Sequence, residues 1–249
     1  MDNTNNTNNT NICFVTGCNS YYFKKWCLLY NSIVTYHSNA LIYFFDLGLT
    51  TDEVNEINEM KKFKIIYHYF NFENYPSWVN IKNIAGQWAW KSQCIKIVLD
   101  NNTSIKYIIW CDSLNSIDKN LFGLFQFLDK NNIYTNNTSG TVKTWTYDAT
   151  IQYFNAENFI NYPMKNGALQ AYNVTIPWVK QFIYDYANYS LIKECIFPDG
   201  SDRSNHRQDQ SILTILYYKY KEVYNFDDNN SYMGISIHTD KNFIRPYEK

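Results

Sequence analysis

The stretch KYIIWCDSLNSIDKNLFGLF, residues 106–125, joins an apolar, β-branched segment to a single acid, a polar turn and an amphipathic run. The apolar part is typical of a buried strand that ends at Asp112. A carboxylate at a strand end is a common ligand for a metal ion or a polar molecule. No second acid follows at Ser113, Leu114 or Asn115. Two interpretations stay open, a ligand site with one acid or a strand end with a polar cap.

Three further apolar segments precede this strand, and amphipathic segments separate them. Helical spacing of the apolar residues predicts helices between the strands, and Thr50 or Thr51 can cap the second helix. Continuous apolar strands that alternate with helices favour a parallel sheet covered on both faces. The predicted strands are 12–17, 40–46, 63–70 and 106–112, and the predicted helices are 21–37, 50–60 and 85–101.

Small or acidic residues close three of these strands, namely Gly17, Asp46 and Asp112. In parallel α/β sheets, ligands bind beyond the carboxyl ends of the strands. The agreement between these three strand ends is the strongest indication of a site that the residues themselves give.

The second half of the chain is less regular. We expect a strand followed by a helix over 141–154, and Asp118 as the N-cap of the helix after the first half. The remaining expected elements are a short strand at 166–173, a helix at 176–192, a loop at 197–207, a helix at 208–220 and a final strand at 234–240. No repeat or Gly/Ser-rich linker interrupts the chain, so a single α/β domain is predicted, preceded by an Asn/Thr-rich tail, residues 1–11, expected to be disordered.

Composition narrows the function classes. The chain has 249 residues, with 45% hydrophobic and 18% charged residues, which is typical of a globular protein. Its net charge of −1 and the lack of a long basic block argue against a nucleic-acid partner. No apolar run long enough to span a bilayer and no secretory signal is present, so a cytoplasmic protein is expected. The six cysteines form no CxxC pair, which predicts buried free thiols.

Five segments, in order along the chain, resemble GT-A glycosyltransferases that use nucleotide-sugar donors. They are FVTGCNSYYFKKWCLLYNSI with IYFFDLGLTTDEVNEI, WAWKSQCIKIVL, YIIWCDSLNSIDKNLFGLF, KNGALQAYNVTIPWVKQFI and HRQDQSILTIL. The combination of DLGL, AWK and W-x-D-S is most similar to glycosyltransferase-like proteins of nematodes and large DNA viruses. The resemblance implies a Rossmann-like, mixed but mainly parallel sheet flanked by helices. It also implies a nucleotide-binding half at 12–118 and an acceptor half at 119–249. If the protein is viral, its expected location is the host cytoplasm or the virus factory.

The resemblance assigns a donor side to the first half. Asp112 matches the first acid of the family's D-x-D, and Lys91 stands where a basic residue often faces the diphosphate. An ordinary strand end and a solvated helix lysine are the alternatives for these two. The implied donor-binding residues are Thr16, Gly17, Tyr21, Tyr22, Lys91, Asp112 and Ser113.

A divalent cation is a further implication. Asp112, and His238 as a late ligand, are the candidates for holding Mn²⁺ or Mg²⁺, ions that prefer oxygen ligands. Leu114 replaces the second acid of the D-x-D. The alternative is therefore that Asp112 binds a sugar hydroxyl while Lys91 neutralises the diphosphate without a metal.

The second half is expected to carry the chemistry. By resemblance, Asp209 and Gln210 lie beside the anomeric carbon, where Asp209 is a nucleophile, a shield or a general base. The alternative for Asp209 is a helix N-terminal acid. Trp145, Tyr147, Asn166 and Gly167 are expected on the acceptor side, and core packing is the alternative for Trp145.

The expected function is transfer of a sugar, from a UDP-sugar, to a glycan or protein acceptor, with retention or inversion left open. The partners are then the donor and the acceptor, with no nucleic acid and no membrane span. A degenerate GT-A domain that binds glycans or acts in a virion is the alternative, since acids common in the family are replaced at Leu114 and Ser211.

Overall fold

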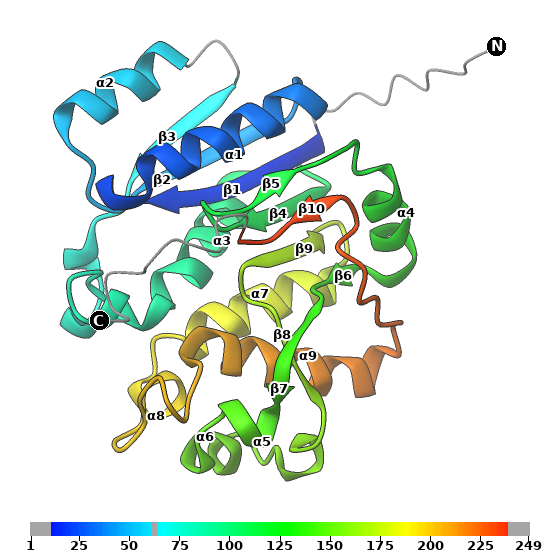
Figure 1. The fold of residues 1–249 in the computed structure, drawn as a ribbon. Coiled ribbons are helices and arrows are strands. Elements are labelled where there is room, and N and C mark those ends of the chain that lie inside the picture. The colour runs from blue at the N-terminus through cyan, green and yellow to red at the C-terminus, as the bar shows by residue number, and fades with distance from the viewer. Residues whose placement is uncertain (1–10, 61–63, 239–249) are drawn as a thin grey trace.

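A six-stranded sheet with strand order β3-β2-β1-β4-β9-β6 forms the centre of the computed structural model, which describes residues 11–60 and 64–238 (Figure 1). β1, β2, β3 and β4 pair in parallel, β9 runs antiparallel between β4 and β6, and all belong to one domain. The predicted mixed, mainly parallel sheet is confirmed. The strands are β1 (Ile12–Cys18), β2 (Leu41–Asp46), β3 (Ile65–Tyr69), β4 (Tyr107–Cys111), β6 (Ile133–Tyr134) and β9 (Leu169–Asn173).

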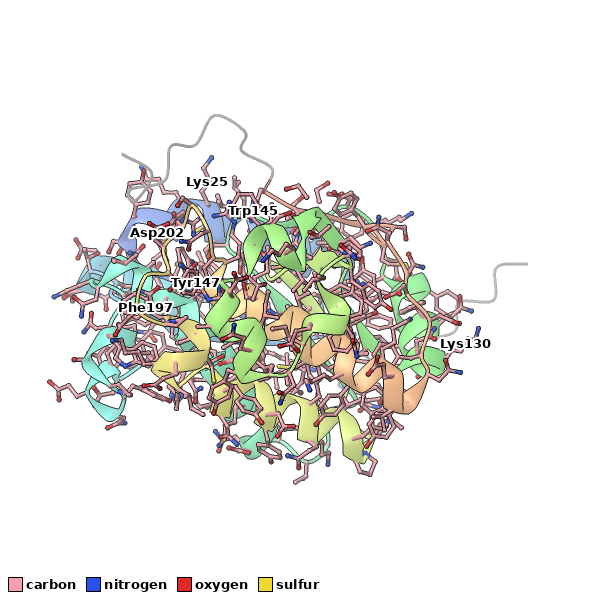
Figure 2. All side chains as sticks on the ribbon, turned by 90° about the horizontal axis from the view of Figure 1, so that it is seen from below. Lys25, Lys130, Trp145, Tyr147, Phe197 and Asp202 are labelled. Carbon is pink, nitrogen blue, oxygen red and sulfur yellow. The ribbon has the colours of Figure 1, made fainter. Side chains whose placement is uncertain are left out.

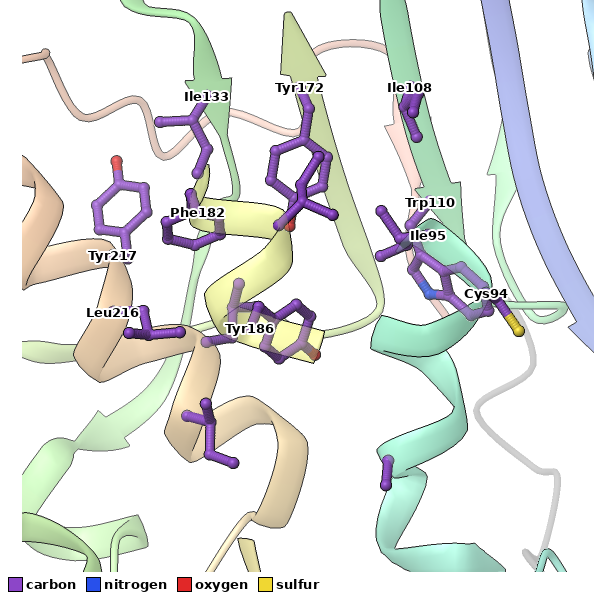
Figure 3. Close-up of a cluster of buried hydrophobic side chains, with 14 of the residues drawn as sticks. Cys94, Ile95, Ile108, Trp110, Ile133, Tyr172, Phe182, Tyr186, Leu216 and Tyr217 are labelled. Carbon is purple, nitrogen blue, oxygen red and sulfur yellow. The ribbon is translucent and has the colours of Figure 1, made fainter. Parts of the chain in front are cut away.

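Helices cover both faces of this sheet, as continuous apolar strands require. One face packs against α1 (Phe23–Tyr36), α2 (Thr51–Glu59) and α4 (Phe122–Asn131) through a buried cluster that includes Trp26, Phe44 and Leu124. The other face packs against α3 (Ala89–Asn101), α7 (Pro177–Tyr189) and α9 (Gln208–Tyr224). Figure 3 shows this second cluster, with α3, α7 and α9 side chains around β4 and β9.

Small elements supplement this sheet, and the short helices of residues 142–153 lie at the bottom of Figure 1. β7 (Asn137–Thr141) and β8 (Pro163–Lys165) form a separate hairpin sheet, and β5 (Ser116–Ile117) pairs with β10 (Ile235–Ser236). Three short helices complete the set, α5 (Val142–Trp145), α6 (Asp148–Tyr153) and α8 (Lys193–Ile196). Single 3₁₀ turns lie at Ser20–Tyr22, Phe72–Asn74, Ser77–Val79 and Glu157–Phe159.

Local capping explains one confirmed prediction and one wrong one. Thr50 caps α2 in a capping box with Glu53, since each side chain bonds the other residue's backbone N–H. Asp118 does not cap α4, which begins after Leu121; the Asp118 carboxylate instead accepts bonds from Ser116 and Ser236. It therefore fastens β5 to β10.

The predicted strand at the start of 141–154 is also wrong. Thr141 caps the short helix α5 through a bond from the Thr144 N–H, and this local bond outweighs the β-propensity of the Val and Thr residues. The final strand is shorter than predicted, at Ile235–Ser236, and residues 239–240 lie outside the described ones. Residues 1–10 of the predicted tail lie outside them as well.

A left-handed turn precedes α3. Five consecutive residues, Ile84 to Trp88, have φ between 47° and 61°, a region that only glycine enters readily. The predicted helix 85–101 therefore begins at Ala89 instead. Gly86 is required within the turn, because a Cβ there would lie 2.0 Å from the Val79 carbonyl oxygen. The turn sets the direction in which Trp88 and α3 leave it.

All six cysteines are free thiols, and five are buried while Cys27 is half-buried, which agrees with the predicted state. Within 11–60 and 64–238, no helix combines the length and the apolar character that crossing a membrane would require.

Candidate functional site

A cleft of about 630 Å³ opens at the carboxyl ends of β1 and β4. It lies where the sequence predicted a ligand site, beyond the ends of parallel strands. Ten of the expected site residues line it: Gly17, Tyr22, Lys91, Asp112, Ser113, Asn166, Gly167, Asp209, Gln210 and His238. These residues come from both halves of the chain, so the cleft is built only when the second half folds onto the first.

Lys91 is the centre of the site. Its ammonium group reaches from α3 to Asp112 Oδ1 at 3.0 Å, Asp209 Oδ2 at 3.5 Å and the Gly167 carbonyl oxygen at 3.0 Å. Both the Lys91 and Asp209 side chains are buried, at 4% and 8% exposure, while Asp112 is 28% exposed toward the cleft. One buried cation thus links two carboxylates that are 97 positions apart in the sequence.

Lys91, Asp112 and Asp209 shift one another's pKa values. Burial works to raise the pKa of Asp112, but Lys91, His238 and Trp110 outweigh it and hold that pKa well below its usual range. Burial raises the pKa of Asp209 to about 6, against the opposing pull of Lys91. Burial alone would lower the pKa of Lys91, yet the two carboxylates raise it. At neutral pH Lys91 is a cation and Asp112 an anion, while Asp209 can gain or lose a proton. Two acids with separated pKa values are a common basis for distinct chemical roles.

The junction of β4 and β9 fixes the position of Asp112. The Trp110 Nε1–H donates to Asp112 Oδ1 at 2.7 Å, and the Asp112 N–H donates to the Ala168 carbonyl at 3.0 Å. The Ser113 hydroxyl donates to the Gly17 carbonyl at 2.9 Å, and the Asn115 amide donates to Ala168 at 2.7 Å. Asp112 is therefore held in one orientation by strand ends rather than by a mobile loop.

Asn166 and Gly167 form the tight turn that leads into β9. The Asn166 side chain accepts a bond from the Ala168 N–H at 2.8 Å, and the Gly167 carbonyl also accepts one from Gln170. A Cβ at Gly167 would lie 3.3 Å from Asp209 Oδ2. The absence of a side chain at Gly167 therefore leaves room for the Asp209 carboxylate beside this turn.

Asp209 and Gln210 lie in the first turn of α9. Asp209 Oδ2 accepts a bond from the Tyr186 hydroxyl of α7 at 3.3 Å. Gln208, the first residue of the helix, has a positive φ of 37°, and both Gln208 and Gln210 line the cleft. An acid early in a helix is favoured by the helix dipole, but this one is buried on the ligand side.

The described residues do not fit a protein-held divalent cation. Asp112 Oδ1 is already bonded to Lys91 and Trp110, and Asp112 Oδ2 lies 3.9 Å from His238 Nε2. Leu114 lines the cleft where a second acid would stand. Across 11–60 and 64–238, no group of three or more His, Cys, Asp or Glu side chains is arranged to hold a metal ion. Asp112 Oδ2 and His238 are then the described groups at which a divalent cation could bind, and most of its ligands would have to come from substrate phosphates and water.

Two expected donor residues do not line the cleft. Thr16 is fully buried inside β1, and Tyr21 is 49% exposed and packs edge-on against Tyr22. Gly17 lines the cleft, but a Cβ at Gly17 would lie 2.8 Å from the Phe45 carbonyl oxygen of β2. The requirement for glycine there thus comes from the neighbouring strand.

Asp46, the third strand-end marker, does not line the cleft either. It accepts bonds from the Gly48 and Leu49 N–H groups and from the Tyr67 hydroxyl. Its role is to close the turn after β2.

Trp145 and Tyr147 also lie outside the cleft lining. Both contact the loop between α8 and α9: the Trp145 carbonyl accepts a bond from the Arg207 N–H, and the Tyr147 N–H donates to His206 Nδ1. The Tyr147 hydroxyl approaches Gly200 so closely that a Cβ there would lie 2.6 Å from it. Figure 2 shows both side chains beside this loop, which also carries Asp202. They support the cleft wall from behind.

Sequence reasoning missed two cationic residues of the cleft, Arg203 and Arg207. The available signal was rarity, because the chain has only three arginines against 19 lysines. Other unexpected lining residues come from the left-handed turn and its neighbours: Lys82, Ile84, Ala85, Trp88 and Trp90. Their positions depend on a backbone conformation that the sequence pattern did not indicate.

Comparison with solved structures defines the class of fold. The galactosyltransferase LgtC, in complex with donor and acceptor sugar analogues, matches with TM-score 0.59 and 14% identity, over 92% of this chain and 87% of that one. Core-mannan synthase A (CmsA/Ktr4) from Aspergillus fumigatus, in a Mn/GDP form, matches with TM-score 0.56 and 10% identity, over 83% and 69%. The fold is therefore that of the GT-A glycosyltransferases.

Sequence comparison matches a smaller part of the chain than structural comparison does. A family model described as "Protein of unknown function (DUF1647)" matches residues 1–96, a range that includes Lys91. No curated protein matches the sequence.

Proposed function

We propose that this protein is a glycosyltransferase that moves a sugar from a nucleotide-sugar donor, UDP-linked, to a hydroxyl group of a glycan or protein acceptor. The observation that carries the proposal is the Lys91 ammonium between Asp112 and Asp209, in a cleft at the carboxyl edge of a GT-A sheet. This arrangement places a fixed cation between an anionic acid and an acid that titrates near neutrality.

In the proposed reaction the bond between the anomeric carbon and the diphosphate oxygen breaks, and a bond to the acceptor oxygen forms. The diphosphate leaves with the bonding electron pair, so positive charge nearby lowers the barrier. Asp112 lies on the donor side, while Gly17 and Tyr22 line the end of the cleft proposed for the base.

Asp209 and Gln210 belong at the reacting carbon in this proposal. With inversion, the Asp209 carboxylate takes the acceptor's proton as general base. With retention, Asp209 or Gln210 stabilises the oxocarbenium-like centre on the face opposite the leaving group. A pKa of about 6 suits a group that must accept a proton near neutral pH.

The test is a thermal-shift screen of nucleotide sugars, followed by a transfer assay with the donor that stabilises the protein. A ligand that binds only the folded state raises the apparent melting temperature. Asp112→Asn and Asp209→Asn should each lower transfer by about a hundredfold or more. Asp148→Asn is the matched control, because Asp148 is exposed on α6 and pairs with Lys143. Full transfer and donor hydrolysis in both site variants would rule out the proposal.

A glycan-binding domain without catalysis is the second candidate. The position of Leu114 in the cleft favours it, and so does Ser211, whose hydroxyl bonds the Trp145 carbonyl at 2.8 Å and is thus engaged structurally. Calorimetry separates the two functions, since a non-catalytic module would bind a glycan and show no affinity for UDP or UDP-sugars.

A further inference from the structure

Two of the chain's three arginines line the cleft, four positions apart. Arg203 lies in the loop between α8 and α9, and Arg207 is the residue that precedes α9. The chain otherwise uses lysine for positive charge, with 19 lysines in all. A lysine is a point charge, whereas a guanidinium offers a planar fork of donors that matches two phosphate oxygens at once. The choice of arginine at both positions thus points to an anionic ligand.

Each guanidinium is held by a tryptophan. Arg203 Cζ lies 4.6 Å from the centre of the Trp88 ring, and Arg207 Cζ lies 3.7 Å from the centre of the Trp145 ring. Arg207 Nη1 also donates to the Arg203 carbonyl at 2.6 Å. A guanidinium stacked by its face keeps its N–H groups in the plane at its edge, which is the side that binds oxyanions. The two arginines are therefore oriented before any ligand binds.

Lys91 is committed to the protein. An ammonium group has three donors, and the Lys91 ammonium faces three acceptors, on Gly167, Asp112 and Asp209. Its charge neutralises the carboxylates and adds little to the binding of a further anion. Among the described lining residues, the other cationic side chains are those of Lys82, Arg203 and Arg207.

The cleft also differs from a metal-assisted diphosphate site. Leu114 takes the place of an acid and Asp112 Oδ1 is bonded to Lys91, so the described residues offer a divalent cation fewer ligands than a pair of acids would. A diphosphate bound here still requires compensating positive charge. Side chains are the remaining source.

We propose that Arg203 and Arg207 bind the diphosphate of the donor nucleotide and that this binding does not require a divalent cation. The inference rests on the proposed function, because it names the part of the same cleft that receives the leaving group. Two guanidinium forks match the two phosphate groups of a nucleoside diphosphate. A single carboxylate on a sugar would occupy one of them only.

The test measures UDP binding by isothermal titration calorimetry in EDTA and in excess Mg²⁺ or Mn²⁺. The proteins are wild type, Arg203→Gln, Arg207→Gln and, as control, Lys180→Gln, which removes an exposed cation of α7 outside the cleft. Uridine and inorganic pyrophosphate, each in EDTA, separate the two ends of the ligand. Arg203→Lys and Arg207→Lys keep the charge and remove the fork.

The UDP dissociation constant of the wild type should differ by less than about threefold between EDTA and metal. Each Arg→Gln change should weaken UDP and pyrophosphate by about tenfold or more, and leave uridine binding unchanged. Unchanged uridine binding shows that the variant is folded. The Arg→Lys variants should recover part of the lost affinity, and Lys180→Gln should bind like the wild type.

UDP binding that is lost in EDTA and restored by Mn²⁺ would overturn the inference, as would Arg→Gln variants that bind UDP normally. Wild-type protein that binds neither UDP nor pyrophosphate would overturn it too. The two proposals fail separately: arginine-dependent pyrophosphate binding without sugar transfer refutes the enzyme alone. Transfer that depends on Asp209 but not on the arginines refutes the inference alone.

Discussion

At the scale of single residues, the site depends on two carboxylates that share one lysine and still differ in protonation. Asp112 faces the cleft and is held as an anion by Lys91, His238 and Trp110, despite burial. Asp209 is more deeply buried, and burial prevails over the same lysine. Asp112 has two further partners, His238 and Trp110, that favour its anion, whereas the charge of Asp112 adds to burial in raising the pKa of Asp209.

This difference predicts a pH profile for transfer. The pKa of Asp209 is raised to about 6, so lowering the pH below 6 protonates the carboxylate that the reaction needs. The value of kcat/KM should fall by about tenfold for each pH unit below 6 and level off above 7. Asp112 stays ionised throughout that range and should not add a second step.

Release of nucleoside diphosphate between pH 5 and 8 measures the profile. Asp148→Asn should keep the wild-type profile, because that exposed acid lies outside the cleft. A rate that stays constant down to pH 5 would show that Asp209 is not the titrating group.

Single residues also show what sequence reasoning can reach. Asp112 and Gly17 were expected at the site because strand ends follow from apolar periodicity, and Lys91 because of the family resemblance; all three line the cleft. Arg203 and Arg207 were missed because a loop without periodic pattern gives no direction to its side chains. Trp145 and Tyr147 were expected on the acceptor side; the Trp145 ring stacks on the Arg207 guanidinium, and the Tyr147 hydroxyl lies beside Gly200.

At the scale of elements, the left-handed turn before α3 is the most constrained part of the cleft. It holds four non-glycine residues at positive φ, each at a cost of about 1–2 kcal/mol. The hydrogen bond from the Trp90 ring to the Ala85 carbonyl at 2.9 Å contributes to its stability. The turn places the Trp88 ring against the Arg203 guanidinium, so the strained backbone helps to form the wall of the cleft.

A pair of glycine substitutions tests this turn. Gly86→Ala should lower the free energy of unfolding by about 2–4 kcal/mol, since its Cβ would lie 2.0 Å from the Val79 carbonyl oxygen. Gly123→Ala is the matched control, because Gly123 lies in α4 with no atom within 4 Å of an added Cβ. That change should raise stability by about 0.5–1 kcal/mol.

Urea unfolding of both variants measures the contrast. Equal stabilities of the two variants would show that the turn relaxes to accept a side chain. The sequence could not predict this turn, since only one of its five residues is a glycine. The regular helices were predicted well because apolar spacing and capping residues agree there, as they do at Thr50.

At the scale of the whole molecule, both halves of the chain contribute to one sheet. β9 of the second half inserts between β4 and β6, and α3 of the first half packs against α7 of the second. We therefore expect a single cooperative unfolding transition. The parallel part of the sheet was predictable from alternating elements, whereas the antiparallel insertion of β9 depends on long-range pairing that no local pattern encodes.

Two buried histidines should make the whole fold sensitive to acid. Burial lowers the pKa values of His37 and His206 to about 4, from a usual value of about 6.5. Both residues are neutral in the folded protein, and His206 connects its loop to the end of α8 at Ile196 and to the segment before α6 at Tyr147. Below pH 6.5 the unfolded chain binds protons that the folded one does not, so stability falls progressively until about pH 4, by at most about 3 kcal/mol for each histidine.

Urea unfolding at pH 7.5 and pH 5.0 measures this loss. His206→Gln should be less stable than the wild type at pH 7.5 and should show a smaller difference between the two pH values. An unchanged difference would exclude His206 as a source of the acid sensitivity.

The alkylation rates of the buried thiols would measure how often the structure around each of them opens. Burial raises the pKa of Cys27 to about 11 and that of Cys195 to about 12, and raises those of Cys13 and Cys94 further. Because only thiolates alkylate rapidly, iodoacetamide should modify Cys27 first and the others only when their surroundings open. Mass spectrometry of partly labelled protein would then rank the helices by how often they detach from the sheet, without an introduced probe.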